Sequence, residues 1–456
     1  MKFPIYNPTT GEVQKELLAS NPEEMRTQFL VAQKAQKQWE RLTYDKRAQV
    51  IDRFATLLEE NKESCARTLT MEMGKPYAQA LSEVSSTVTR VRWFIEHTEN
   101  WIQSETMWSD NSISEEISYE PLGVIGNISA WNYPYFVGTN VFIPALLAGN
   151  AVMYKPSEYT TLTGLKITEL MQDAGIPEGL WVTLVGGKEV GEAMLELPLA
   201  GMFFTGSHRV GLHVNQKVSK RLSRVGLELG GKDPVYVCED VNVEKAAASV
   251  ADGAFYNAGQ SCCAVERIYV HAAIYKEFLE QVTNFVNKMQ VGDPLAKDTY
   301  LGPLTRKEQI AFLQNQVDDA LSKGARILVK QENIPEKGWF YPPTVLVDVD
   351  HTMLIMQEES FGPIVGIQRV QDDREALDLM SETRYGLTAG MFTKSEERAR
   401  KLLRNINAGT VYWNCCDRVS VNLPWSGRKD SGLGSTASRL GIQAFVQPKA
   451  WHMRNP

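Results

Sequence analysis

The stretch Gly123-Val-Ile-Gly-Asn-Ile-Ser129 is a short apolar run that ends in polar residues, and it opens the region that decides the fold. Similar runs follow it, separated by segments with helical spacing. This alternation predicts a parallel sheet with helices on both faces, in which ligands bind beyond the carboxyl ends of the strands. The other expected strands are 151–155, 181–185, 201–205 and 224–228, and the helices between them are 162–174, 189–195 and 208–221.

A second unit of the same kind follows, so we expect an α/β protein with two doubly wound parts. Upstream of both, apolar spacing predicts helices over 21–60 and 84–101. Asn21 is a candidate N-terminal cap and Pro22 fits the first turn. Before them, the turn 7–11 separates two short extended pieces. The second unit has expected strands at 234–238, 267–271, 366–369, 389–392 and 409–413, with helices at 272–291 and 306–323.

Two segments outside these units have the pattern of isolated strands. Residues 112–119 alternate polar and apolar side chains, and residues 443–452 also have an extended pattern. The two could pair as a protruding ribbon. Such a ribbon is marginal alone and needs a neighbouring sheet, such as that of another subunit.

The composition narrows the classes of function. With 456 residues, 43% hydrophobic and 23% charged, the chain is an ordinary globular protein long enough for two or three domains. A net charge of −7 without a long basic tract argues against nucleic acid as a partner. The most apolar run, 141–154, is too short to span a membrane, and the N-terminus has no apolar signal core. The six histidines show no ligand spacing, so no metal site is predicted.

Six cysteines, four of them in two adjacent pairs, make a poor disulfide framework. This pattern indicates a reducing compartment, and we expect a cytoplasmic protein. One pair lies in Tyr256-Asn-Ala-Gly-Gln-Ser-Cys-Cys-Ala264, after a run typical of a buried helix. A cysteine there is either an inert core residue or a nucleophile. Glu228, 34 residues before Cys262, and Asn132 favour the second, because acyl chemistry needs a thiol, a base and an amide donor.

Two segments at strand ends have features of a nucleotide site. Phe204-Thr-Gly-Ser-His-Arg-Val-Gly211 ends a strand and opens a helix, where backbone N–H groups suit a pyrophosphate. The same segment is equally typical of a tight strand-to-helix turn. In Lys155-Pro-Ser-Glu158, the lysine could hold ribose hydroxyls or a phosphate and the carboxylate could accept from a ribose diol, or the two could form a solvated pair in a loop.

In their order and spacing, these pieces resemble the NAD(P)-dependent aldehyde dehydrogenase superfamily, from about residue 6 to the C-terminus. The motifs that carry the resemblance are Trp131-Asn-Tyr-Pro134, Lys155-Pro-Ser-Glu158, Phe204-Thr-Gly-Ser207, Glu228-Leu-Gly-Gly-Lys232, Gly259-Gln-Ser-Cys-Cys263, Glu359-Ser-Phe-Gly-Pro363 and Pro424-Trp-Ser-Gly427.

The resemblance implies a catalytic mechanism. Cys262 is the nucleophile, Glu228 is the base that activates water, and Asn132 with the backbone N–H of Cys262 forms an oxyanion hole. The implied reaction is thiolate attack on an aldehyde, hydride transfer to a nicotinamide cofactor, and hydrolysis of the thioester to a carboxylic acid.

The resemblance also implies cofactor contacts and an architecture. Glu158 would repel a 2′-phosphate, which favours NAD, although Lys155 and Ser157 leave NADP possible. The implied domains are a cofactor domain (1–105 and 122–227), a catalytic domain (228–423) and an oligomerisation ribbon (106–121 and 424–456), in a homodimer or homotetramer. The implied cofactor contacts are Trp131, Lys155, Ser157, Glu158, Gly206, Ser207, Gln309, Glu359 and Phe361.

The family's substrate tunnel, carried over by alignment, does not choose a substrate. Aromatic residues at the mouth suit an apolar or cationic aldehyde, whereas Arg418 suits an anionic semialdehyde or points to solvent. Thr436 and Val141 stand where many hydrolytic members have glutamate and lysine, which puts the speed of deacylation in question. The implied tunnel residues are Tyr133, Asn140, Ser261, Cys263, Arg418, Val419 and Trp425, with Val137 and either Trp93 or Phe94.

Three other interpretations stay open at this point. A CoA-acylating dehydrogenase would release the acyl group to CoA, but such enzymes generally lack the base. A cofactor-independent thiol hydrolase would need a suitably placed histidine. A structural protein that has kept the fold would not need the nucleophile, base and amide together.

Overall fold

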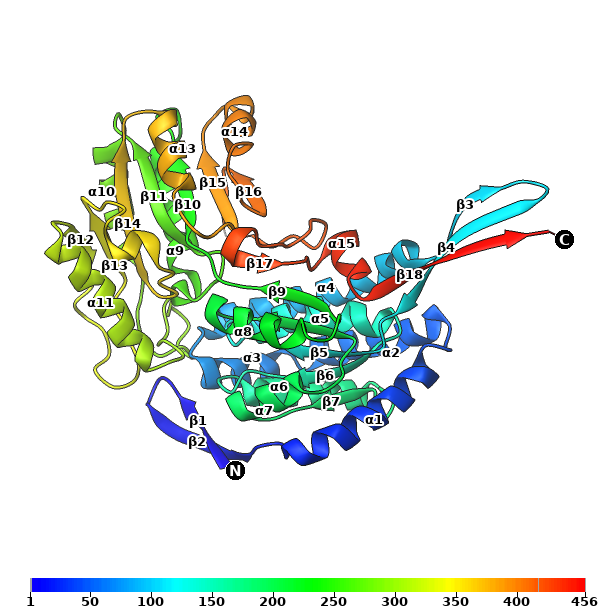
Figure 1. Cartoon of the computed structure of the whole chain (residues 1–456). Helices are drawn as coiled ribbons and strands as arrows, with labels where there is room; N and C mark the ends of the chain where they lie inside the picture. The colour runs from blue at the N-terminus through cyan, green and yellow to red at the C-terminus, as the bar shows by residue number, and fades with distance from the viewer. Residues whose placement is uncertain (1, 417, 456) are drawn as a thin grey trace.

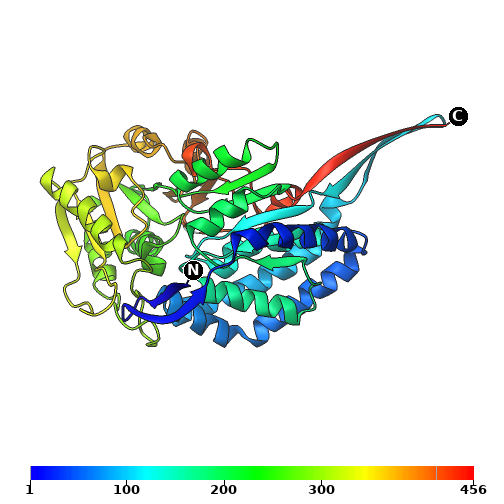
Figure 2. The same ribbon diagram turned by 60° about the horizontal axis from the view of Figure 1, so that its bottom comes forward.

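The computed structural model describes residues 2–416 and 418–455. It consists of two α/β lobes, each built on its own sheet, and a narrow ribbon that projects from one lobe (Figure 1). A view turned by 60° shows the ribbon extending well beyond the body, with the C-terminus at its tip (Figure 2). The α/β fold class predicted from the sequence is confirmed.

The first lobe contains a six-stranded sheet of order β17-β9-β8-β5-β6-β7. Strands β5 to β9 run parallel, and all five were predicted. Strand β17 comes from far along the chain and pairs antiparallel with β9. The strands are β5 (Val124–Ile128), β6 (Ala151–Lys155), β7 (Trp181–Thr183), β8 (Gly201–Thr205), β9 (Arg224–Glu228) and β17 (Gly432–Leu433).

Helices α1 to α8 pack on this sheet and share one apolar core with it. The segment predicted as a single helix over 21–60 is two helices, because Thr43 has an extended backbone and starts a new one. Asn21 caps the first helix as predicted, since its side-chain oxygen accepts from the N–H of Glu23 at 3.1 Å. The helices are α1 (Pro22–Trp39), α2 (Tyr44–Glu60), α3 (Lys62–Met73), α4 (Tyr77–Ile102), α5 (Pro134–Leu147), α6 (Thr161–Asp173), α7 (Lys188–Leu195) and α8 (His208–Val218).

The second lobe contains a seven-stranded sheet of order β12-β13-β14-β11-β10-β15-β16, with a separate apolar core. Strand β12 alone is antiparallel to its neighbour in this sheet. The sequence analysis missed β12 and β13, which are short. The strands are β10 (Asp233–Val237), β11 (Val265–His271), β12 (Arg326–Lys330), β13 (Thr344–Val347), β14 (Ile364–Val370), β15 (Thr388–Phe392) and β16 (Thr410–Trp413).

The helices of this lobe include the one that leads to the adjacent cysteines. Helix α9 is buried over much of its length, as predicted, and the 3-10 turn η1 follows it directly. The helices are α9 (Val243–Phe255), η1 (Tyr256–Gly259), α10 (Tyr275–Val286), α11 (Glu308–Ser322), α12 (Leu354–Gln357), α13 (Asp373–Ser381), α14 (Glu396–Leu403) and η2 (Lys429–Ser431).

The ribbon differs from its prediction in two respects. It has three strands rather than two, in the order β18-β4-β3. Its C-terminal segment also begins later in the chain than the predicted residue 424. The reason is that β17 belongs to the six-stranded sheet and helix α15 packs against α4. The elements are β3 (Glu105–Ser109), β4 (Ile113–Pro121), α15 (Ser438–Gln443) and β18 (Val446–Arg454).

The N-terminal segment forms the hairpin of β1 (Lys2–Asn7) and β2 (Glu12–Leu18), which confirms the two extended pieces on either side of the turn. The backbone N–H of Trp339 donates to the carbonyl oxygen of Pro8 at 2.9 Å, so the hairpin contacts the second lobe. Within the described ranges, 2–416 and 418–455, the helices all fall short of the length and apolarity needed to cross a membrane.

Candidate active site

A cleft of about 750 Å³ lies between the two lobes, and its wall includes the last residues of strands β5, β6, β8 and β9. This volume is typical of a site for a small molecule or cofactor. The cleft is lined by every residue that the sequence analysis assigned to catalysis or to the cofactor. They are Cys262, Glu228, Asn132, Trp131, Lys155, Ser157, Glu158, Gly206, Ser207, Gln309, Glu359 and Phe361.

Cys262 is presented by a strained turn at the end of α9. Asn257 and Ala258 have φ values of 55° and 54°, in the left-handed region, and Gly259 follows with 67°. A Cβ atom at Gly259 would lie 2.3 Å from the carbonyl oxygen of Gly362, so only glycine fits there. Left-handed non-glycine residues cost roughly 1–3 kcal/mol each and persist where surrounding contacts hold them.

The two adjacent cysteines have different surroundings. Cys262 is partly exposed and lines the cleft, whereas Cys263 is buried against Leu387, Trp425 and Ala437. Since a nucleophile must be reached by the substrate, the structure favours Cys262 over its neighbour.

Asn132 lies in the turn after β5 and contacts the loop that carries Cys262. Its Nδ2 donates to the carbonyl oxygen of Gln260 at 3.1 Å. Its own carbonyl oxygen accepts from Lys75 Nζ at 2.7 Å and from Asn257 Nδ2 at 3.3 Å. The side chain of Asn132 is therefore held by Gln260 and its backbone by Lys75 and Asn257, and the residue lines the cleft together with Cys262.

The sequence analysis missed an ion pair behind this turn. Lys75 and Glu83, whose side chains are 0% and 2% exposed, are paired with each other. Glu83 also accepts from the backbone N–H of Tyr135, at the start of α5, at 3.0 Å. Lys75 lies 3.7 Å from the centre of the Tyr133 ring. The only sequence feature that could have indicated this pair is the position of Lys75 and Glu83 at the edge of an apolar helical segment.

Glu228 ends β9, in the same sheet as the strand that precedes Asn132, and lines the cleft. Burial raises its pKa to about 7, against the opposing effects of a hydrogen bond from the Thr436 hydroxyl and the positive charge of Arg90. A carboxyl group that titrates near neutrality suits proton transfer from water. Thr436 and Val141 line a small cavity beside Glu228.

The model of the aldehyde dehydrogenase family matches residues 1–451. The chain belongs to this family. It is 32% identical to a probable succinate-semialdehyde dehydrogenase [NADP(+)] of Synechocystis, over 98% of this chain and 99% of that protein. It is 33% identical to retinaldehyde dehydrogenase 3 of Mus musculus, over 98% and 89%. A double mutant of betaine aldehyde dehydrogenase from Staphylococcus aureus, crystallised with NAD+ and a modified cysteine, is similar with a TM-score of 0.95 and 29% identity, covering 100% of this chain and 94% of that one.

In this aldehyde dehydrogenase, the outer part of the cleft has features that suit a dinucleotide. Ser207 precedes α8 without capping it through its side chain, so the positive end of the helix is open to an anion. Lys155 Nζ lies 3.6 Å from Glu158 Oε2, and burial lowers the pKa of that lysine. Both residues line the cleft at the end of β6, where hydroxyl groups of a ribose could replace or share this pair.

A second buried ion pair that the sequence analysis missed lies next to the segment that carries Glu359. Lys232 Nζ lies 2.5 Å from Glu266 Oε2. Glu266 accepts from the backbone N–H of Ser360 at 2.7 Å and of Phe361 at 3.0 Å, which fixes the segment after Glu359. Burial and the nearby Glu266 raise the pKa of Glu359 to about 8.

Glu359 itself lies against the backbone of two consecutive glycines. The N–H of Gly231 donates to Glu359 Oε1 at 3.1 Å. A Cβ atom at Gly230 would lie 2.2 Å from the carboxylate oxygens, so the motif Glu228-Leu-Gly-Gly-Lys232 is shaped to receive this side chain.

Of the residues assigned to the substrate tunnel, Val137 lines this cleft, whereas the others are not among the described residues of its wall. Val419 and Trp425 are in the apolar cluster of Cys262 and Cys263, and Ser261 Oγ lies 3.5 Å from Cys263 Sγ. Arg418 is exposed. Asn140 is buried and accepts from Arg90, a residue that the sequence analysis did not single out.

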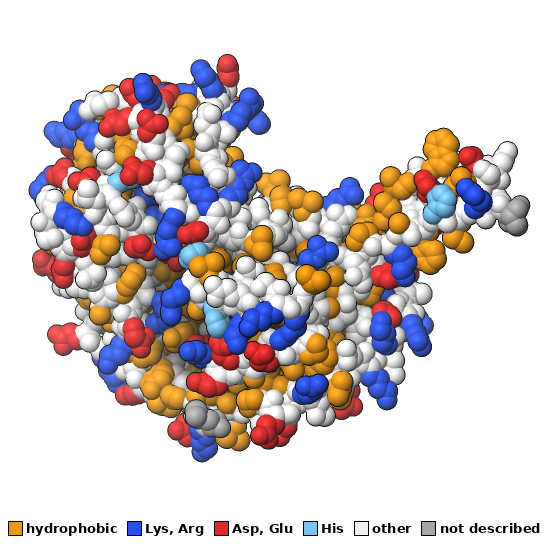
Figure 3. Space-filling view, viewed as in Figure 1, with side chains coloured by type: hydrophobic (Ala, Val, Ile, Leu, Met, Phe, Trp, Pro, Cys, Tyr) orange, Lys and Arg blue, Asp and Glu red, His pale blue; other side chains and the backbone are white. Residues whose placement is uncertain are grey.

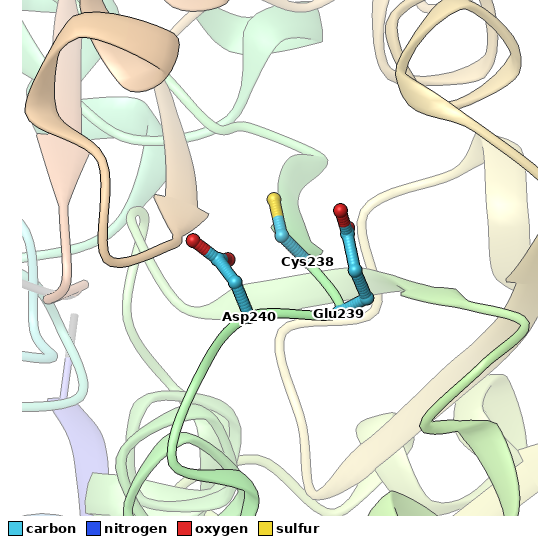
Figure 4. A group of neighbouring side chains, drawn as sticks. All are labelled: Cys238, Glu239 and Asp240. Carbon is cyan, nitrogen blue, oxygen red and sulfur yellow. The ribbon is translucent and has the colours of Figure 1, made fainter.

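A separate group of possible metal ligands, Cys238, Glu239 and Asp240, lies at the end of β10 (Figure 4). Both carboxylate oxygens of Glu239 accept from Arg398 at 3.0 Å. Asp240 Oδ2 accepts from the Thr393 hydroxyl at 2.9 Å, and burial raises the pKa of the Cys238 thiol. Because both carboxylates are engaged within the protein and burial disfavours the thiolate form of Cys238, we assign no metal to them.

Proposed function

We propose that this aldehyde dehydrogenase oxidises its substrate through a thioester on Cys262. The observation that carries the proposal is that Cys262, Asn132 and Glu228 come from both lobes and line one cleft. A thiol, an amide donor and a carboxyl group whose pKa is near 7 are the groups that this reaction requires.

Each residue has a defined task in the proposed mechanism. The Cys262 thiolate attacks the aldehyde carbon, and the resulting oxyanion accepts from Asn132 Nδ2 and the backbone N–H of Cys262. NAD(P)+, when bound, would supply the hydride acceptor for that carbon, so that Cys262 would then carry a thioester. Glu228 then takes a proton from the water that attacks the thioester, and the acid is released.

The cleft fits NAD(P) by its chemistry. The open start of α8 at Ser207 suits the pyrophosphate, and Lys155 with Glu158 suits the adenosine ribose. Glu359 suits the nicotinamide ribose. Glu158 disfavours a 2′-phosphate, so NAD is the first cofactor to test, and NADP is the second because Lys155 and Ser157 are adjacent.

Two variants test the proposal by the ultraviolet absorbance of the reduced cofactor. Cys262→Ala should bind cofactor and oxidise no aldehyde, and activity like that of the wild type would move the nucleophile elsewhere. Glu228→Gln should release a burst of reduced cofactor and then stall. If the wild type turns over steadily only when CoA is added, and not with water alone as the acyl acceptor, the enzyme is of the CoA-acylating class. Cofactor binding without oxidation of any aldehyde would indicate a structural role.

The exposed ribbon supports a homodimer or homotetramer. Met107, Trp108, Trp451 and Met453 are exposed on it, and the space-filling view shows apolar side chains along the ribbon (Figure 3). Strand β16 is an edge of the seven-stranded sheet and could receive the ribbon of a second copy. Light scattering of the wild type and of Trp451→Glu tests this, since the variant should dissociate. The six cysteines, all within the described residues, form no disulfide, which supports the cytoplasmic location that we propose.

A further inference from the structure

A buried arginine that the proposed mechanism does not use lies beside the catalytic residues. Arg90, on α4, is 3% exposed. Its Nη1 donates to Asn140 Oδ1 at 2.7 Å, and its Nη2 donates to the carbonyl oxygen of Val419 at 3.0 Å. The guanidinium lies 3.7 Å from the centre of the Phe136 ring. Arg90 is therefore enclosed by α4, α5 and the segment after β16.

The charge of Arg90 has no counter-ion in contact. Within the described ranges of the chain, no carboxylate oxygen lies within 4.0 Å of its nitrogen atoms, and its Nε has no hydrogen-bond partner. Lys75 and Lys232 are also buried, but each is paired with a glutamate. Glu228 offsets the charge of Arg90 only in part, because its carboxylate is not in contact with the guanidinium. Since a buried charge without a contacting partner is unfavourable, an anion bound beside Arg90 would be stabilised there.

The surroundings of Arg90 belong to the reaction site. Its partners Asn140 and Val419 are both assigned to the substrate tunnel, and Val419 packs in the apolar cluster that includes Cys262. Glu228 is close enough for the charge of Arg90 to lower the pKa of that carboxyl group. Arg418, the cation to which the sequence pointed, is exposed instead.

We infer that Arg90 binds the end of the substrate remote from the aldehyde, and that the substrate carries an anionic group such as a carboxylate there. This inference rests on the proposed function, because it concerns the same site. A planar guanidinium suits a carboxylate, and its hydrogen bonds to an anion are stronger than those to neutral acceptors. The same charge repels an aldehyde that carries a cationic group.

The first test compares substrates of the same carbon skeleton with the wild-type enzyme. We expect succinate semialdehyde to have a kcat/KM about tenfold or more above that of its methyl ester, and an aminoaldehyde of equal length to be poorer still. A methyl ester oxidised as well as the acid would overturn the inference and leave the proposed function intact. Failure to oxidise any aldehyde would instead overturn the proposed function, and this inference with it.

The second test replaces the arginine and measures the ratio of kcat/KM for the acid to that for the ester. This ratio does not depend on the fraction of enzyme that is folded. Arg90→Gln should lower it by about tenfold to hundredfold, and Arg90→Lys should lower it less. Arg92→Gln, on the exposed side of the same helix, is the matched control and should keep the ratio.

Two results with the variants would contradict the assignment. Equal losses for acid and ester in Arg90→Gln would mean that Arg90 only braces Asn140 and Val419. A ratio that falls in Arg418→Gln and not in Arg90→Gln would place the anion at the tunnel rim. Inhibition of the wild type by butyrate, weakened in Arg90→Gln, would support the inference by a measurement that does not need turnover of a substrate.

Discussion

Replacing Thr436 by valine should raise the pH at which deacylation begins. The Thr436 hydroxyl donates to Glu228 Oε1, and this hydrogen bond stabilises the ionised form of a carboxyl group that burial otherwise keeps protonated. The pKa of about 7 is the balance of these effects. Valine has a similar shape and no hydroxyl, so it removes the hydrogen bond and leaves the burial.

The size of the effect follows from the strength of a hydrogen bond to a charged group, roughly 1.5–3 kcal/mol. At about 1.4 kcal/mol for each pH unit, its loss should raise the midpoint by about one to two units. The sign is upward, because the lost bond favoured the carboxylate. At about pH 7 the ionised fraction of Glu228 then falls about fivefold to fiftyfold, and raising the pH restores it.

The assay is steady-state production of reduced cofactor across the pH range, with a single-turnover measurement of the burst. In Thr436→Val the burst should persist, while the steady-state rate near neutral pH should fall. Thr436→Ser is the matched control, because it keeps the hydroxyl and should keep the midpoint. An unchanged midpoint in the valine variant would show that this carboxyl group does not limit deacylation.

Three further predictions concern other parts of the site. Lys75→Met should lower kcat about tenfold to hundredfold with little change in the KM for the cofactor, because the Asn132 carbonyl loses its charged partner and keeps only Asn257; Lys46→Met, at an exposed position, is the control, and a change confined to thermal stability would refute the positioning role. Glu158→Gln should raise kcat/KM for NADP relative to NAD about tenfold, and an unchanged cofactor preference would assign the choice elsewhere. Cys263→Ser should keep its rate and its labelling by a thiol reagent at Cys262, whereas loss of both would contradict the choice of nucleophile.

The parts of the fold that the sequence predicted are those with a local pattern. Strands β5 to β9 are short apolar runs because helices bury them on both faces, and their alternation with helices fixes their parallel arrangement. Strand β12 is a mostly exposed edge strand with little contrast between its faces, and it was missed. The three-stranded ribbon was incomplete for the same reason, since β3 is exposed along its whole length.

Sequence motifs identified the residues that line the cleft. The contacts that hold these residues in place were not predicted, because they join residues that are distant in sequence. Lys75 and Asn132 are separated by 57 positions, and Arg90 and Val419 by 329. No periodicity relates such residues, so their meeting depends on how the lobes pack. For the same reason the sequence pointed to Arg418, which lies in a recognisable segment, and overlooked Arg90 in a regular helix.

The two buried ion pairs explain how both walls of the cleft keep their shape. Lys75 with Glu83 binds the carbonyl of Asn132 and the N–H of Tyr135, and Lys232 with Glu266 binds the N–H groups that follow Glu359. The cost of removing such charges from water offsets most of their attraction, so stability alone does not account for them. What each pair adds is a charged group aimed at backbone atoms that hydrophobic side chains could not hold. Neutralising one pair as a unit should therefore preserve folding better than removing one partner, while still displacing the catalytic segment it holds.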